Sequence, residues 1–157
     1  MTIPRHITEF LDAQQVPYLQ GTHRPEYTAQ EIAHAAHVSG KVLVKTVMVM
    51  AGDRLIMTVL PASCEVSLSA LGQLLGTRRV RLATEEEFRS LFPDCEVGAM
   101  PPLGNLYSLD VWFDVSLRQH PTIVFSAGTH TDTLQMNLAD VERIVRPNVG
   151  KFAWPLH

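Results

Sequence analysis

The spacing of apolar residues along the chain switches between the period of a helix and that of a strand. Ile3, Ile7, Phe10 and Leu11 recur at helical intervals and predict a first helix over roughly residues 4–15. Short runs that are rich in β-branched residues predict strands instead. The strands expected on this basis cover residues 16–20, 42–50, 55–60, 80–83, 106–114, 122–126 and 133–137.

Polar residues at the ends of apolar segments mark where further helices begin and end. Thr28-Ala29-Gln30-Glu31 and Thr84-Glu85-Glu86-Glu87 have the spacing of a capping box. They predict one helix toward residue 36 and another to about residue 92. Ser67 and Gly76 are suited to the two ends of a helix between them. A last helix is predicted over residues 139–145, before Pro147.

The order of these elements indicates the fold class. Ala51-Gly52-Asp53-Arg54 joins two expected strands as a hairpin, so part of the sheet is antiparallel. Helices and strands also do not alternate regularly, as they would in a doubly wound parallel sheet. We therefore expect a mixed α/β (α+β) fold, with a mixed, partly open, barrel-like sheet flanked by helices. The chain has 157 residues, a length typical of one domain, so we expect a single domain over residues 1–157.

Composition narrows the classes of function. Hydrophobic residues make up 46% of the chain and charged residues 18%, which is typical of a folded globular protein. With no apolar run of membrane-spanning length and no secretory signal, we expect a cytoplasmic protein with no membrane partner. A net charge of −3 argues against DNA or long nucleic acid as a partner, but not against the end of an RNA.

Lys45 is the only charged residue in the strand predicted over residues 42–50. Placing an ammonium among apolar side chains is costly unless it reaches a polar site. The lysine either extends from a sheet edge into water or serves a binding site, and the strand pattern leaves both interpretations open.

Gly98-Ala99-Met100-Pro101-Pro102-Leu103-Gly104 is a loop of small and rigid residues. Its glycines allow the backbone to approach a ligand and its prolines fix φ. Fixed N–H groups of such a loop can hold a carbonyl or a developing oxyanion, although most loops of this composition are plain turns. A second such segment, Ser126-Ala127-Gly128-Thr129-His130, follows a later strand. His130 is placed either to contact a ligand or only to cap a turn.

Other candidate residues are less informative. His34 and His37 lie one helical turn apart, but no third ligand accompanies them, so we expect no metal site. Cys95 adjoins the glycine loop, but its neighbour Asp94 is a poor base for a thiol nucleophile. We therefore expect an inert thiol. Because the activated-serine and P-loop motifs are also missing from the sequence, hydrolysis would depend on water and backbone electrostatics.

Four short motifs together resemble the YbaK family, relatives of the editing domain inserted in bacterial prolyl-tRNA synthetases. They are Lys45-Thr46 in a strand, a GxxxP loop from Gly98 to Pro102 followed by Leu103-Gly104, Asp114 after a strand, and Ser126-Ala127-Gly128. Each motif is short, and the specificity lies in their joint order and spacing. The resemblance extends from the first helix to about Pro147.

The resemblance implies a free-standing aminoacyl-tRNA deacylase without a metal or organic cofactor. Such an enzyme hydrolyses the ester between a wrong amino acid and the terminal adenosine of a tRNA. Lys45 matches the family's essential lysine, which is expected to hold the terminal nucleotide or the carbonyl. Gly98 matches the glycine whose backbone orients the ester and the attacking water. The substrate-binding residues implied are His23, Thr46, Ala99, Met100, Pro101, Pro102, Ser126, Gly128 and His130.

One departure from the family bears on specificity. The YbaK branch itself has Lys-Arg-Gly after the glycine near Gly128, whereas this chain has Thr129-His130-Thr131. This difference argues against cysteinyl-tRNA(Pro) and favours tRNA(Pro) carrying a small uncharged amino acid such as alanine or serine. The expected partners are the acceptor end of an aminoacyl-tRNA and, as a further candidate, a synthetase. The alternatives are a non-catalytic module that binds aminoacyl-tRNA ends or a synthetase, and a thiol-dependent ester hydrolase that uses Cys95.

Overall fold

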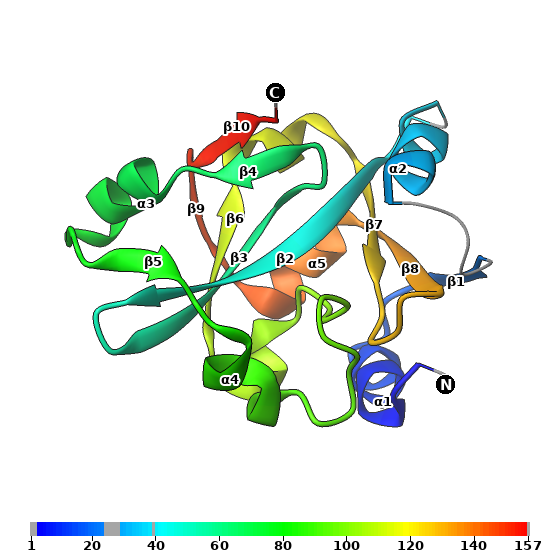
Figure 1. Ribbon diagram of the computed structural model, residues 1–157. Coiled ribbons are helices and arrows are strands. Elements are labelled where there is room, and N and C mark those ends of the chain that lie inside the picture. Colours follow the sequence, from blue (N-terminus) through cyan, green and yellow to red (C-terminus); the bar gives the residue numbers. More distant parts are fainter. Residues whose placement is uncertain (1–2, 24–28, 39, 157) are drawn as a thin grey trace.

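The computed structural model describes residues 3–23, 29–38 and 40–156. Its largest feature is a mixed sheet crossed by the long strand β2, Val42–Ala51 (Figure 1). The strand order is β1-β8-β7-β2-β3-β6-β9, and β5 pairs with the last three residues of β2. The other strands of this sheet are β1 Leu19–Thr22, β3 Arg54–Pro61, β5 Val80–Leu82, β6 Asp110–Asp114, β7 Thr122–Ser126, β8 Asp132–Asn137 and β9 Asn148–Gly150.

Parallel and antiparallel pairs coexist in this sheet, as the sequence predicts. β2 pairs antiparallel with β3 and parallel with β7, and β3 pairs parallel with β6. Among the described strands, β1 and β9 stand at the two ends of the order and do not pair with each other, so the sheet is open. A separate two-stranded ladder joins β4 (Cys64–Val66) to β10 (Ala153–Pro155).

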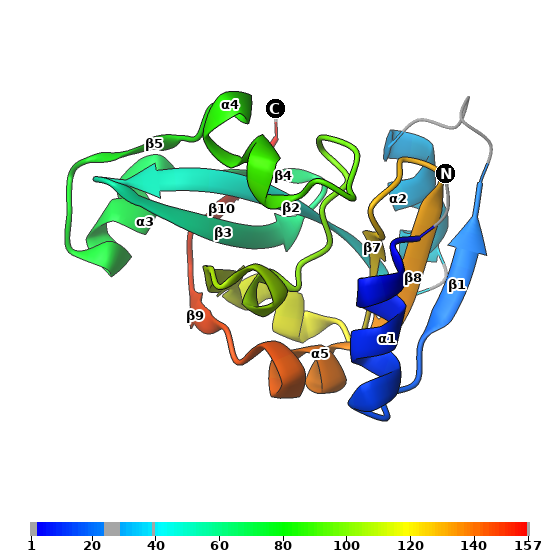
Figure 2. The ribbon, with the colours of Figure 1, turned by 90° about the horizontal axis from the view of Figure 1, so that it is seen from below.

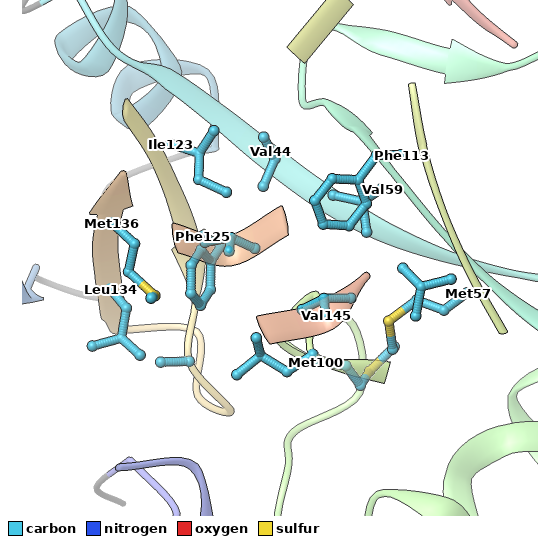
Figure 3. Close-up of a cluster of buried hydrophobic side chains, with 14 of the residues drawn as sticks. Val44, Met57, Val59, Met100, Phe113, Ile123, Phe125, Leu134, Met136 and Val145 are labelled. Atoms are coloured by element: carbon cyan, nitrogen blue, oxygen red, sulfur yellow. The ribbon is translucent and has the colours of Figure 1, made fainter. Parts of the chain in front are cut away.

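Helices cover both faces of the sheet. They are α1 Arg5–Ala13, α2 Ala29–Val38, α3 Leu68–Leu75, α4 Glu85–Phe88 and α5 Leu138–Val145, with 3-10 helices η1 Arg89–Leu91, η2 Gly104–Tyr107 and η3 Val115–Gln119. In Figure 2, α1 and α5 lie on one side of the β2–β3 layer, with α1 beside β8. Side chains of both helices enter the main hydrophobic core, part of which is drawn in Figure 3.

The central strand β3 is buried on both faces. Its Val59 belongs to the main core, whereas Leu60 joins a smaller cluster with Val49, Leu71 and Phe152. Because successive side chains of a strand point to opposite faces, one strand contributes to both cores. The sheet is therefore packed on both sides, and it fixes the positions of the loops at the ends of its strands.

The local signals for helix ends and for the hairpin are confirmed. The Ser67 hydroxyl accepts a hydrogen bond from Ala70 N at 3.1 Å, and Gly76 ends α3 with a φ of 73°. Gly52 turns between β2 and β3 with a φ of 64°. The capping box from Thr84 to Glu87 is formed at α4. The other predicted box begins at Thr28, which lies outside the described residues.

Two predicted strands start at the wrong residue. β1 begins at Leu19 rather than at residue 16, because Gln15 adopts a φ of 57° in a turn that sends Val16 into the core. β6 begins at Asp110 rather than at residue 106, because the preceding residues form the 3-10 helix η2. That segment closes by a hydrogen bond of 3.0 Å from Leu109 N to Gly104 O. In both places the apolar residues fill the core without forming a strand.

The C-terminal strands β9 and β10 carry no recognisable sequence signal and were not predicted. The buried Asp114 secures this region, because its Oδ1 accepts hydrogen bonds from Phe152 N and Ala153 N, both at 2.9 Å. Its Oδ2 accepts a further bond from Ser116 N at 3.0 Å and one from the Ser116 hydroxyl. Asp114 is therefore a structural residue at the end of β6, where it joins η3 to the C-terminal segment.

Candidate active site

A pocket of about 380 Å³ lies where β2, β7, the segment after β1 and the Gly98 loop meet. Apolar side chains form much of its wall, and polar groups are interspersed among them. A cavity of this kind is the usual form of a small-molecule site. The lining residues are His23, Ile32, Leu43, Val44, Lys45, Thr46, Ala62, Gly98, Met100, Phe125, Ser126, His130 and Thr133.

Lys45 is half-buried in the wall of this pocket, on the strand β2 and opposite Leu60 of β3. Within the part of the chain that the structure describes, its ammonium has no hydrogen-bond acceptor and no carboxylate partner. A partly desolvated cation interacts with an anion or a polarised carbonyl more strongly than it would in water. Lys45 thus lies in the pocket wall, between the part of β2 that pairs with β7 and the part that pairs with β5.

Gly98 lies in a tight turn that faces the same pocket. The turn spans Glu96 to Ala99 and is closed by a hydrogen bond of 3.0 Å from Ala99 N to Glu96 O. Gly98 is the third of its four residues and has a φ of 85°, a conformation that a type II turn requires at this place and that favours glycine. Gly98 is exposed, and among the described residues nothing accepts a hydrogen bond from its N–H. That donor is available to a ligand.

Two hydrogen bonds fasten the Gly98 turn to the loop after β7. Glu96 N donates to Gly128 O at 2.7 Å, and Gly128 N donates to Ala99 O at 2.8 Å. Gly128 has a φ of 92°, and a Cβ added there would lie 2.6 Å from Cδ of Pro4. The two glycine-containing segments found in the sequence therefore form one unit in space.

His130 is held against the Gly98 turn. Its Nε2 lies 2.8 Å from Val97 O, and its backbone N donates to Glu96 Oε2 at 3.3 Å. Because a carbonyl oxygen only accepts, Nε2 must carry the proton in that contact, which leaves Nδ1 of the neutral ring as an acceptor. The same Glu96 Oε2 lies 3.7 Å from Nε2. Glu96, which the sequence reasoning did not single out, thus helps to fix the histidine.

The predicted site residues divide into two sets in the structure. Lys45, Thr46, Gly98, Met100, Ser126, His130 and His23 line the pocket together. Ala99, Pro101, Pro102 and Gly128 do not line it and are buried. Thr133 and the apolar residues of β2 and β7 were missed as lining residues. The alternation of β7 could have indicated Phe125, but only the pairing of β7 with β8 places Thr133 opposite Ser126.

The other candidates lie apart from this pocket. His34 and His37 line a separate cavity with Lys41, and the described residues contain no group of three or more metal-ligating side chains. Cys95 is half-buried, and burial raises the pKa of its thiol, which disfavours the nucleophilic thiolate. Its sulfur lies 3.7 Å from the Tyr107 hydroxyl, which is no base. This environment does not support a thiol-dependent hydrolase.

A family model of the aminoacyl-tRNA editing domain matches residues 23–144 of the chain, more than half of its length. The chain belongs to the aminoacyl-tRNA editing domain family. This match agrees with the resemblance that the four sequence motifs indicated. The matched segment includes Lys45, Gly98 and His130 but not α1.

Solved structures share the fold of this editing domain. The crystal structure of hypothetical protein APE2540 superposes with a TM-score of 0.82 at 21% identity, covering 94% of this chain and 99% of the other. A candidate trans-editing enzyme for prolyl-tRNA synthetase superposes with a TM-score of 0.79 at 21% identity, covering 96% of each chain. A search of curated protein sequences finds no match. Of the helices in the described residues, none has the length and apolar character to cross a membrane.

Proposed function

We propose that this editing domain is a deacylase that acts in trans on mischarged tRNA. The observation that carries the proposal is that one pocket is lined both by Lys45, whose ammonium has no partner among the described residues, and by Gly98, whose N–H has no acceptor among them. Both groups complement negative charge, which develops on the carbonyl oxygen when an ester is hydrolysed. Membership of the editing-domain family supports an ester of tRNA as the substrate.

In the proposed reaction, water attacks the carbonyl carbon of the aminoacyl ester. The carbonyl oxygen becomes negatively charged and is stabilised by the Gly98 N–H, while Lys45 holds the terminal nucleotide or the carbonyl. The bond from the carbonyl carbon to the ribose oxygen then breaks, and that oxygen leaves with a proton. The free amino acid and the tRNA with its terminal hydroxyl restored are the products. The neighbouring ribose hydroxyl assists the attack, so the substrate supplies part of the machinery.

The remaining site residues have binding or supporting roles in this proposal. His23, Thr46, Met100, Ser126 and His130 contact the substrate from the pocket wall. Ala99, Pro101, Pro102 and Gly128 support that wall from behind and keep the glycine turn rigid. No metal or organic cofactor takes part, and the water is positioned by the protein and the ribose.

The proposed substrate is tRNA(Pro) carrying a small uncharged amino acid such as alanine or serine. Aspartate and glutamate are not among the residues that line the described pocket, and its polar side chains are mostly hydroxyls and histidines. Synthetases discriminate poorly between small amino acids, because one methylene contributes only about 1–3 kcal/mol. The resulting mischarged tRNAs are usually removed by hydrolysis at a second site. The protein would work in the cytoplasm on the acceptor end, with a synthetase as a candidate partner.

A panel of mischarged tRNAs tests this proposal. We expect hydrolysis of alanyl- or seryl-tRNA(Pro), and much slower hydrolysis of correctly charged prolyl-tRNA(Pro). Release of the amino acid from labelled ester at pH 7 measures the rate directly. Tight binding to aminoacyl-tRNA without hydrolysis of any member of the panel would instead support the non-catalytic module.

A further inference from the structure

The N-terminal helix α1 contacts both loops that form the active site, although it lies outside the segment matched by the family. Pro4, at its N-cap, abuts Gly128 so closely that a Cβ there would lie 2.6 Å from the proline ring. Ile7 and Leu11 are fully buried in the main core. Figure 2 shows the helix beside β8, below the loop that follows β7. α1 is thus a fixed support under the Gly98–Gly128 unit.

A chain of polar contacts joins α1 to the segment just before the Gly98 turn. His6 Nδ1 lies 3.0 Å from Asp94 Oδ2, and His6 Nε2 lies 2.9 Å from the Tyr107 hydroxyl. That hydroxyl in turn lies 3.7 Å from Cys95 Sγ. We call these four residues the His6 network.

Each donor in the His6 network has an acceptor when the imidazole is neutral. The Asp94 carboxylate accepts from Nδ1–H, so Nε2 accepts from the Tyr107 hydroxyl. The phenol oxygen can then accept from the Cys95 thiol. Burial raises the pKa of Tyr107, which keeps its hydroxyl protonated as this direction of bonding requires. The rings of His6 and Tyr107 also meet edge to face at 5.7 Å, which fixes both.

The position of Asp94 and Cys95 determines where the Gly98 turn begins. Cys95 N is bonded to Phe92 O at 3.1 Å, and the next residue, Glu96, donates to Gly128 O at 2.7 Å. Gly98 is two residues further along. A shift of Asp94 would therefore be transmitted through a short, hydrogen-bonded segment to Gly98, which lines the pocket. Displacements of this kind are costly in catalysis, because reacting groups must be held within a fraction of an ångström.

We propose that His6 is a positioning residue for the editing site, acting through Asp94 and Tyr107 to hold the Gly98 turn in place. The inference rests on the proposed deacylase function. His6 does not line the pocket and touches no substrate. Its charged neighbours on the same helix, Arg5 and Glu9, pair with each other at 3.5 Å on the exposed side.

The decisive experiment compares substitutions in the network with a matched control on α1. His6→Leu removes both polar contacts and keeps bulk, and Tyr107→Phe removes only the hydroxyl. Both should lower kcat for the mischarged tRNA by about ten- to a hundredfold, with KM changed less than about twofold. The double variant should be no slower than the slower single one, because both substitutions break one network. Glu9→Gln, which breaks only the exposed pair with Arg5, should leave kcat unchanged.

Two further readouts separate positioning from a general loss of structure. Added imidazole should restore kcat to His6→Ala but not to Lys45→Ala. Amide hydrogen exchange at Glu96 and Gly128 should accelerate in His6→Leu and Tyr107→Phe while exchange in β3 stays unchanged. If His6→Leu keeps wild-type kcat and exchange rates, the proposal is wrong. If the wild type hydrolyses no mischarged tRNA, the deacylase proposal fails, and the exchange rates still test whether His6 positions the turn.

Discussion

His130 Nε2 lies 2.8 Å from the carbonyl oxygen of Val97, the residue before the glycine that faces the pocket. The contact links 33 positions of sequence, and it fixes both the ring and the carbonyl side of the turn. The space between Gly98 and His130 is also narrow, since a Cβ on Gly98 would lie 3.4 Å from Cε1 of the ring. The histidine and the turn therefore form one part of the pocket wall.

Lys45→Ala should abolish deacylation without unfolding the protein. Losing one preorganised electrostatic contact typically lowers the rate by about 10²–10³. The variant should keep the thermal stability of the wild type, because the ammonium has no partner to lose within the described residues. Lys151→Ala is the matched control, since that lysine lies over the ring of Trp154, 5.4 Å from its centroid, and away from the pocket. Near-normal single-turnover rates for Lys45→Ala would contradict the mechanism.

Gly98→Val should reduce turnover far more than Cys95→Ala. A φ of 85° is unfavourable for any residue with a Cβ, by about 1–2 kcal/mol, and a β-branched side chain is the most restricted. The turn must then either change shape or crowd His130. Cys95→Ala removes only a weak hydrogen bond to Tyr107 and should stay within about threefold of the wild type. The rates of single-turnover hydrolysis of alanyl-tRNA compare the two variants. Full activity of Gly98→Val would show that the turn takes no part in the mechanism.

His130→Ala should change which amino acids are released. The selectivity of a pocket depends on its volume and on a few polar contacts, and His130 supplies both at the pocket wall. We would compare kcat/KM for alanyl-, seryl-, cysteinyl- and prolyl-tRNA. The ratios should shift by about tenfold or more. An equal loss on every substrate would instead assign the histidine to catalysis or to holding Val97.

Deacylation should survive prolonged treatment with EDTA. The residues that line the described pocket include two histidines but no carboxylate or thiol, so they do not provide a typical set of three protein ligands for zinc. Rates before and after chelation, with metal content measured in parallel, check this expectation. Loss of activity that zinc restores would contradict this prediction and would indicate a metal site at His34 and His37.

Asp114→Ala should destabilise the fold by about 3 kcal/mol or more, because it removes a buried acceptor of several hydrogen bonds. Two backbone N–H groups of the C-terminal segment would lose their partner. Asp110→Ala is the control, since its ion pair with Arg54 is exposed and should contribute less than about 1 kcal/mol. Urea unfolding of both variants measures the difference. Similar midpoints would show that Asp114 has no special structural role.

Local patterns in the sequence were enough to predict most of the helices and strands. Ser67, Gly76 and the capping box at Thr84 act on backbone groups within a few residues, so their effect does not depend on the rest of the fold. The unusual lysine in β2 could be recognised for a similar reason, since a charge in an apolar strand requires an explanation. Apolar content alone was a weaker guide, as the misplaced starts of β1 and β6 demonstrate.

The sequence by itself determined that Lys45 lies on a strand, that Gly98 begins a loop of small and rigid residues, and that both belong to an editing-domain pattern. Only the tertiary structure decided that Lys45, Gly98 and His130 share one pocket, and that Glu96 and Gly128 are bonded at 2.7 Å. It also decided that His6 reaches Asp94, 88 positions later in the chain. These contacts depend on strand pairing and loop packing between distant segments. Periodicity and capping signals act over a few residues and carry no information about such partners.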